Sequence, residues 1–185
     1  MPDALAGQRA LDFNLSHDGP VTVIALARGK TVGVDVVALP CRARFLKIAQ
    51  RFFSQQESAS LHALPQHRQA ARFSDLWALK EAYVKARGEG LSRRFDSFAF
   101  DLERPGRIGF APSFDPIHQV SSGQPTVPDV LHTGWHFSLY RHFSGLVIAL
   151  CFSEEGNLPR VQFRRMNPFA PATDITCDPV RQTTP

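Results

Sequence analysis

The chain has 185 residues, of which 43% are hydrophobic and 15 are Phe, enough apolar material for one compact domain with a substantial core. Its 21 Lys and Arg against 17 Asp and Glu give a net charge of +4, which favours an anionic partner: a phosphate ligand, nucleic acid or an acidic protein. Cys41, Cys151 and Cys177 are too widely spaced for a disulfide framework or a metal-ligand pattern. With neither a signal peptide nor a membrane-spanning apolar run, we expect a soluble cytoplasmic protein.

The first half of the chain predicts two strands followed by helices. Residues 1–10 have no period and indicate a loop, whereas residues 21–28 and 31–37 are β-branched runs that Gly29-Lys30 would join as a hairpin. Residues 42–53 carry apolar side chains at helical spacing. Ser54 followed by Glu57 resembles a capping box that opens a second helix through Leu64.

The second half predicts one more helix and then strands. The helix covers residues 72–87 and is closed by Gly88 and Gly90. Strands are expected at 95–102, 107–110, 135–140 and 146–152, with an exposed loop at 111–130. This order favours an α+β fold. We place the domain at residues 1–153 and expect the proline-rich residues 154–185 to form a flexible tail.

Three short motifs carry side chains suited to chemistry. The first spans residues 13–19, where Ser16, His17 and Gly19 can offer a hydroxyl, an imidazole and backbone amides to an anion. The plainer interpretation is a polar turn before a strand.

The second motif is the valine-rich run 32–37, which contains a single carboxylate, Asp35. Such a carboxylate could bind Mg²⁺, and Gly33 would let a neighbour approach the backbone closely. The alternative is a side chain at the solvated end of an edge strand.

The third motif is the helix around Trp77, in which Lys80 falls in the middle of the apolar stripe and Glu81 at its edge, one turn before Lys85. Charges that face a core are costly unless they are paired or bind something charged. Alternatively, Lys80 snorkels out of the core while Glu81 and Lys85 form a surface pair.

Taken together, the three motifs suit phosphoryl-type transfer. Asp35 and Glu81 can supply two carboxylates to a metal, and His17, Lys80 and Lys85 can supply positive charge to phosphates. A nucleic-acid-binding domain is disfavoured because the basic residues are scattered without an aromatic platform.

At these residues the sequence resembles the 4′-phosphopantetheinyl transferases, in particular the surfactin-synthetase-associated type. The family motifs F-N-x-S-H, G-x-D-x-E and W-x-x-K-E-[AS]-x-x-K correspond to residues 13–17, 33–37 and 77–85. The stretches 51–57, 88–91 and 96–98 agree as well, and the resemblance covers residues 11–152.

The resemblance implies an α+β fold of two pseudo-symmetric halves with coenzyme A between them. It implies Mg²⁺-dependent transfer of the 4′-phosphopantetheine arm from coenzyme A to a serine of an acyl or peptidyl carrier protein. Asp35 and Glu81 would hold Mg²⁺, and Glu81 would also be the base for the carrier serine. Lys85, Lys80, Ser16 and His17 would contact coenzyme A phosphates.

The chain departs from the family pattern at two places. Val37 stands where the family has a second acidic ligand of the metal. Only twelve residues precede Phe13, so we expect either a start further upstream or a shortened form with an incomplete first half. The alternative is therefore a truncated, noncatalytic remnant that binds coenzyme A or a carrier protein. An open apolar face where the first half should lie would favour a truncated or partner-dependent protein.

Overall fold

A four-stranded antiparallel sheet forms the centre of the computed structural model, in the order β10-β6-β7-β3. The model describes residues 10–39, 44–90, 94–111, 134–142, 145–153, 160–167 and 169–183. The strands are β1 (Leu11–Asp18), β2 (Val21–Arg28), β3 (Val32–Ala38), β4 (Ala99–Asp101), β5 (Gly109–Ala111), β6 (Trp135–His142), β7 (Leu146–Ser153), β8 (Phe163–Asn167), β9 (Ala170–Ile175) and β10 (Pro179–Gln182). The helices are α1 (Phe45–Phe52), α2 (Gln55–Ala63) and α3 (Gln66–Ala86), with a short 3-10 helix at Phe95–Ser97. The α+β prediction is confirmed.

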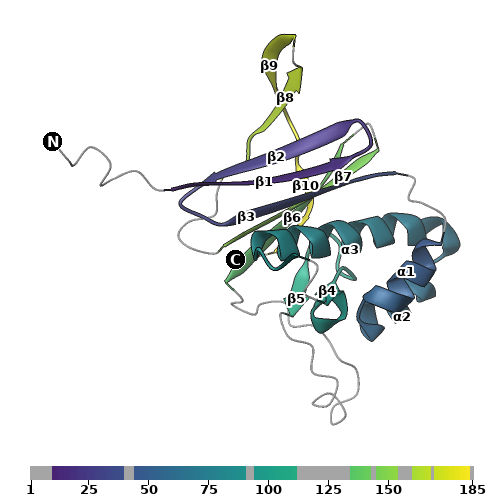
Figure 1. Cartoon of the computed structure of the whole chain (residues 1–185). Helices are drawn as coiled ribbons and strands as arrows, with labels where there is room; N and C mark the ends of the chain where they lie inside the picture. Colours follow the sequence, from purple (N-terminus) through teal and green to yellow (C-terminus); the bar gives the residue numbers. More distant parts are fainter. Residues whose placement is uncertain are drawn as a thin grey trace.

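The long helix α3 lies across one face of the sheet, and the β1–β2 ribbon lies on the other side (Figure 1). Helices α1 and α2 and the β4–β5 pair lie on the same side as α3. Alternation along β3 explains this division, since Gly33 and Asp35 face α3, whereas Val32, Val34 and Val36 face the ribbon.

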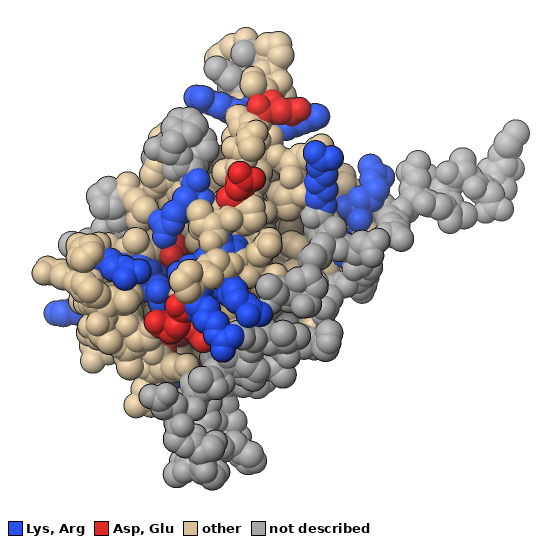
Figure 2. Space-filling model, turned by 180° about the vertical axis from the view of Figure 1, so that it is seen from behind, with Lys and Arg blue, Asp and Glu red and all other residues tan. Residues whose placement is uncertain are grey.

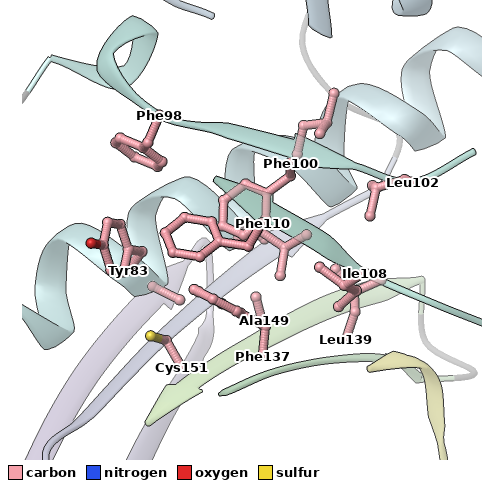
Figure 3. Packing of buried hydrophobic residues seen from close by; sticks show 14 of the residues in the cluster. Tyr83, Phe98, Phe100, Leu102, Ile108, Phe110, Phe137, Leu139, Ala149 and Cys151 are labelled. Carbon is pink, nitrogen blue, oxygen red and sulfur yellow. The ribbon is translucent and has the colours of Figure 1, made fainter. Parts of the chain in front are cut away.

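Aromatic side chains fill the space between α3, the β4–β5 pair and the sheet (Figure 3). The ring centroid of Tyr83 lies 5.0 Å from the ring centroid of Phe98 and 4.9 Å from that of Phe110, and both pairs of rings meet edge to face. Phe137 of β6 lies 4.7 Å from Phe110 and closes the cluster against the sheet. Such pairs contribute about 0.5–1.5 kcal/mol each beyond the area they bury. The cluster therefore holds α3 on the sheet.

Gly33 determines how closely α3 approaches β3. A Cβ atom at this position would lie 2.0 Å from the carbonyl oxygen of Ala82 and 2.6 Å from the amide nitrogen of Ala86. The sequence predicted that Gly33 would allow a close approach to the backbone, and the neighbour is α3 itself.

The predicted hairpin between residues 21–28 and 31–37 is wrong, although both strands exist. β2 pairs with β1, whereas β3 pairs with β7. The chain turns at Gly29 from the ribbon into the central sheet, because β3 finds a partner of matching length in β7 and buries both of its faces there.

The helix predictions need smaller corrections. The capping box is confirmed, since Ser54 Oγ accepts from the amide of Glu57 while the Glu57 carboxylate accepts from the amide of Ser54. α3 begins at Gln66 rather than at residue 72, because its first turns are largely exposed and carry no apolar stripe to mark them. It ends at Ala86, and Gly88 and Gly90 both adopt positive φ.

Strands replace the tail that was predicted after residue 153. β10 adds to the edge of β6, and the amide of Ile108 donates to the carbonyl of Gln182 at 3.0 Å. Pro179 is tolerated because it opens an edge strand, where a missing amide costs little. β8 and β9 form a separate pair that projects from the body (Figure 1). The predicted loop at 111–130 lies outside the described residues apart from Ala111.

Two properties expected from composition can be compared with the structure. Cys151 and Cys177 are free thiols, and Cys41 lies outside the described residues. Within the described part of the chain, no helix is both long enough and apolar enough to cross a lipid bilayer.

Candidate functional site

Three polar side chains from different elements meet at the free edge of β3. Lys85 Nζ of α3 lies 2.7 Å from Asp35 Oδ1 of β3 and donates to Ser16 Oγ of β1 at 2.8 Å. Ser16 Oγ in turn donates to Asp35 Oδ1 at 2.7 Å. Asp35 and Ser16 are buried, whereas the Lys85 side chain remains 27% exposed. The structure thus brings together one member of each sequence motif.

A row of side chains fixes β1 along this edge. Alternate residues of β1 accept hydrogen bonds from alternate backbone amides of β3, each twenty positions further along the chain. The pairs are Asp12 with Val32 (2.8 Å), Asn14 with Val34 (3.1 Å), Ser16 with Val36 (3.4 Å) and Asp18 with Ala38 (2.7 Å). These bonds satisfy the backbone amides on the free edge of β3, where no neighbouring strand accepts from them. They also set the register that brings Ser16 to Asp35. Sequence reasoning missed Asp12, Asn14 and Asp18, although the polar alternation in β1 was a readable signal.

Glu81 lies one turn before Lys85 on α3 and is half-buried. Its pKa is raised, first by burial and then by the charge of Asp35, and Lys85 opposes the shift. Burial also raises the pKa of Asp35, against the lowering effect of Lys85. Because burial raises the pKa of both carboxyl groups and the charge of Asp35 raises that of Glu81 further, a further cation would stabilise their ionised forms.

The two carboxylates fit Mg²⁺, which commonly takes one or two protein carboxylates and completes its shell with phosphate oxygens and water. Among the described residues, no cluster of three or more His, Cys, Asp or Glu side chains is arranged to bind a metal ion. Val37 lies on the same side of β3 as Asp35 and packs against the core cluster. The position that the resemblance assigns to a second acidic ligand is therefore apolar here, and Asp35 and Glu81 stay the predicted metal ligands.

Lys80 does not join this cluster, and a contact between Lys80 and coenzyme A stays a prediction. Its amine lies 2.9 Å from Glu57 Oε2 and donates to the carbonyls of Phe95 at 2.7 Å and Phe98 at 2.8 Å. Burial lowers the pKa of Lys80, and the Glu57 carboxylate opposes that shift. The prediction of a charge facing the core is confirmed, but the paired group is a structural partner on α2.

His17 follows Ser16 in β1 and therefore points to the opposite side of the strand, where it is exposed. The structure does not bring His17 to Asp35, and a contact between His17 and coenzyme A stays a prediction.

Comparison with known proteins identifies the family of the chain. The model of the 4′-phosphopantetheinyl transferase superfamily matches residues 31–151. The chain is 32% identical over 117 residues to the 4′-phosphopantetheinyl transferase Sfp of Bacillus subtilis, covering 60% of this chain and 51% of Sfp. It is 39% identical over 95 residues to psf-1 of Bacillus pumilus, covering 51% of this chain and 40% of that protein. The holo-[acyl-carrier-protein] synthase structure from Thermotoga maritima aligns with a TM-score of 0.47 and 22% identity, covering 80% of this chain and 84% of that one.

The chain therefore belongs to the 4′-phosphopantetheinyl transferase superfamily. The surfactin-associated protein Sfp is among its relatives, as the resemblance of the motifs predicted. The chain spans about half the length of the curated relatives it matches.

Proposed function

We propose that this chain transfers the 4′-phosphopantetheine arm of coenzyme A to a serine of an acyl or peptidyl carrier protein, with Mg²⁺ as cofactor. The observation that carries the proposal is the meeting of Asp35, Lys85 and Ser16 at one strand edge. Glu81 is close enough for the charge of Asp35 to add to the effect of burial in raising the Glu81 pKa. Membership of the superfamily supports the reaction class.

In this proposal Asp35 and Glu81 hold the metal, which would neutralise charge on the pyrophosphate of coenzyme A. The Lys85 side chain is partly exposed, so its amine can turn from Asp35 toward a phosphate oxygen. Ser16 holds Asp35 in place and can donate to a phosphate. The proposal assigns the exposed His17 side chain a contact with coenzyme A outside this cluster.

The transfer forms a bond between the carrier serine oxygen and the phosphorus next to the pantetheine arm. The bond between that phosphorus and the bridging oxygen breaks, and adenosine 3′,5′-bisphosphate leaves with the electron pair. Glu81 accepts the serine proton, directly or through water, and a raised pKa makes its carboxylate a stronger base than an ordinary glutamate.

The charge balance of the chain suits an acidic carrier protein. The formal net charge is +4, and basic and acidic side chains are interspersed on the face seen in Figure 2. A charge of this size would steer encounter with an acidic partner rather than supply affinity. We place the reaction in the cytoplasm, where coenzyme A and carrier proteins meet.

A noncatalytic binder of coenzyme A or carrier protein is the second candidate. It is favoured by the open apolar face of the β1–β2 ribbon, where Phe13 and Leu26 are each 67% exposed. Intact-mass analysis of an apo carrier protein incubated with the chain, coenzyme A and Mg²⁺ separates the two. A gain of one phosphopantetheine arm that is lost without Mg²⁺ supports transfer, and binding without any gain supports the second candidate.

Replacing Glu81 by Gln should slow carrier loading by about 10²-fold or more, because it removes both a metal ligand and the base while preserving side-chain size. The rate is followed by intact mass at saturating coenzyme A, and circular dichroism checks that the fold is intact. Glu103→Gln is the matched control, since Glu103 pairs with Arg72 on another part of the surface. Loading by Glu81→Gln at the normal rate would remove this residue from the mechanism.

Replacing Val37 by Glu should lower the Mg²⁺ concentration for half-maximal loading by roughly tenfold, because it adds a carboxylate on the Asp35 side of β3. Val37→Gln has the same size without the charge and should leave the titration unchanged. An identical Mg²⁺ titration for all three proteins would mean that position 37 does not reach the metal.

A further inference from the structure

The Lys85 ammonium is held by three oxygen atoms of β1 and β3. Its Nζ atom lies 2.7 Å from Asp35 Oδ1, 2.8 Å from Ser16 Oγ and 3.3 Å from the carbonyl oxygen of Val34. An ammonium has three N–H donors, and these three acceptors use all of them. Carboxylate and carbonyl oxygens are also the ligands that hard divalent cations take. Lys85 is therefore the cation of a small oxygen-lined cluster.

Ser16 commits its hydroxyl group to the same arrangement. Ser16 Oγ donates to Asp35 Oδ1 at 2.7 Å, and it accepts from Lys85 Nζ at 2.8 Å and from the amide of Val36 at 3.4 Å. A hydroxyl has one donor and two acceptor positions, so all three are in use. Because Asp35 Oδ1 already accepts from both Ser16 and Lys85, a second cation that approaches this oxygen meets the ammonium.

The charge balance of the cluster favours exchange of cations over sharing. Asp35 and Glu81 carry two formal negative charges against the one positive charge of Lys85, and burial raises the pKa of both carboxyl groups. A divalent cation added beside the ammonium would leave one net positive charge in a partly buried cluster. A divalent cation in place of the ammonium would leave none, which avoids the free-energy cost of an unbalanced charge removed from water.

The Lys85 side chain can leave Asp35 without a movement of the backbone. It is 27% exposed and ends in a charge on a flexible four-carbon stem. The last turn of α3, from which it extends, is held in the core by Tyr83, Val84 and Ala86, all buried. Rotation about side-chain bonds alone therefore carries the amine from Asp35 toward solvent.

We propose that the Lys85 ammonium competes with the divalent cation for Asp35, and that Lys85 turns outward to a phosphate of coenzyme A in exchange for the metal. This inference rests on the proposed function, which assigns the metal to Asp35 and Glu81. Competition weakens metal binding to the chain alone, and a phosphate that accepts the ammonium relieves it. Metal and coenzyme A therefore raise each other's affinity through Lys85.

Binding of Mn²⁺ without coenzyme A tests the competition, since Mn²⁺ favours the same oxygen ligands as Mg²⁺ and its free concentration is measured by electron paramagnetic resonance. Lys85→Met removes the competing charge and should tighten Mn²⁺ binding by at least about tenfold. Lys47→Met is the matched control, because Lys47 is exposed on α1 and its replacement removes the same charge elsewhere. It should leave the affinity unchanged. Adding Asp35→Asn to Lys85→Met should abolish the gain.

Equal Mn²⁺ affinity of the wild type and Lys85→Met would overturn the proposal, because ammonium and metal would then share the cluster. So would a Lys85→Met variant that binds no Mn²⁺ at millimolar concentration, or a gain that survives Asp35→Asn. Should Lys85→Met not fold, the NMR signal of the Lys85 ammonium nitrogen in the wild type decides. It should shift during a Mg²⁺ titration, and an unchanged signal would overturn the competition.

None of these measurements uses carrier loading, so the two proposals fail separately. A chain that loads carrier protein but shows no effect of Lys85→Met on Mn²⁺ affinity would disprove the competition alone. A chain that shows the effect but never loads carrier protein would support the competition and disprove the proposed transfer.

Discussion

Replacing Lys80 by methionine should lower the free energy of unfolding by about 3–5 kcal/mol, because it leaves a buried carboxylate without its cation. Glu57 accepts hydrogen bonds from the Ser54 amide and hydroxyl and from the amide of Phe100, in addition to its contact with Lys80. The Lys80–Glu57 pair therefore joins α2, α3 and β4, and its loss should destabilise all three elements. Chemical denaturation monitored by circular dichroism measures the change.

Two further variants separate the charge effect from packing. Lys80→Met combined with Glu57→Gln removes both charges and should recover most of the lost stability. Arg68→Met is the matched control on the same helix: its side chain is exposed, so its replacement should cost little stability. A Lys80→Met variant as stable as the wild type would contradict a structural role for the pair.

Replacing Gly33 by alanine should impair both folding and transfer. The added Cβ would lie 2.0 Å from the Ala82 carbonyl oxygen and 2.6 Å from the Ala86 amide nitrogen, so α3 must move away from β3. Overpacking of this kind costs about 3 kcal/mol. Because a displacement of about 1 Å can cost 10²-fold in rate, loading by the folded fraction should fall about that much as Glu81 and Lys85 leave Asp35.

A second substitution, at Ala86, tests whether the losses of stability and loading rate come from the backbone contacts of α3 or from the Ala86 side chain. Ala86→Gly removes the Ala86 Cβ, which would lie 2.8 Å from the new methyl group, but leaves both backbone contacts in place. The double variant Gly33→Ala/Ala86→Gly should therefore recover little. Full recovery of unfolding free energy and loading rate would show that side-chain crowding alone was responsible, and that α3 does not need Gly33 for its position.

Short-range patterns in the sequence were sufficient for much of the fold and part of the site. The Ser54–Glu57 capping box and the β6–β7 pair depend on neighbouring residues, and the structure has both. The three motifs also placed Asp35, Glu81 and Lys85 in one functional group, and the structure brings Asp35 and Lys85 into contact. The pairing of β2 was mispredicted because a Gly-Lys turn is compatible with either a hairpin or a change of layer.

The sequence by itself determined that Lys80 faces the core, since helical phase is a local property of the chain. Only the tertiary structure decided that its partner is Glu57, because that contact depends on how α2 packs on α3. The same holds for Ser16, which reaches Asp35 only because side chains of β1 bond to the free edge of β3. The alternation of polar residues in β1 indicates which side chains share a face, but it does not identify the amides to which they bond, so those partners are set by packing.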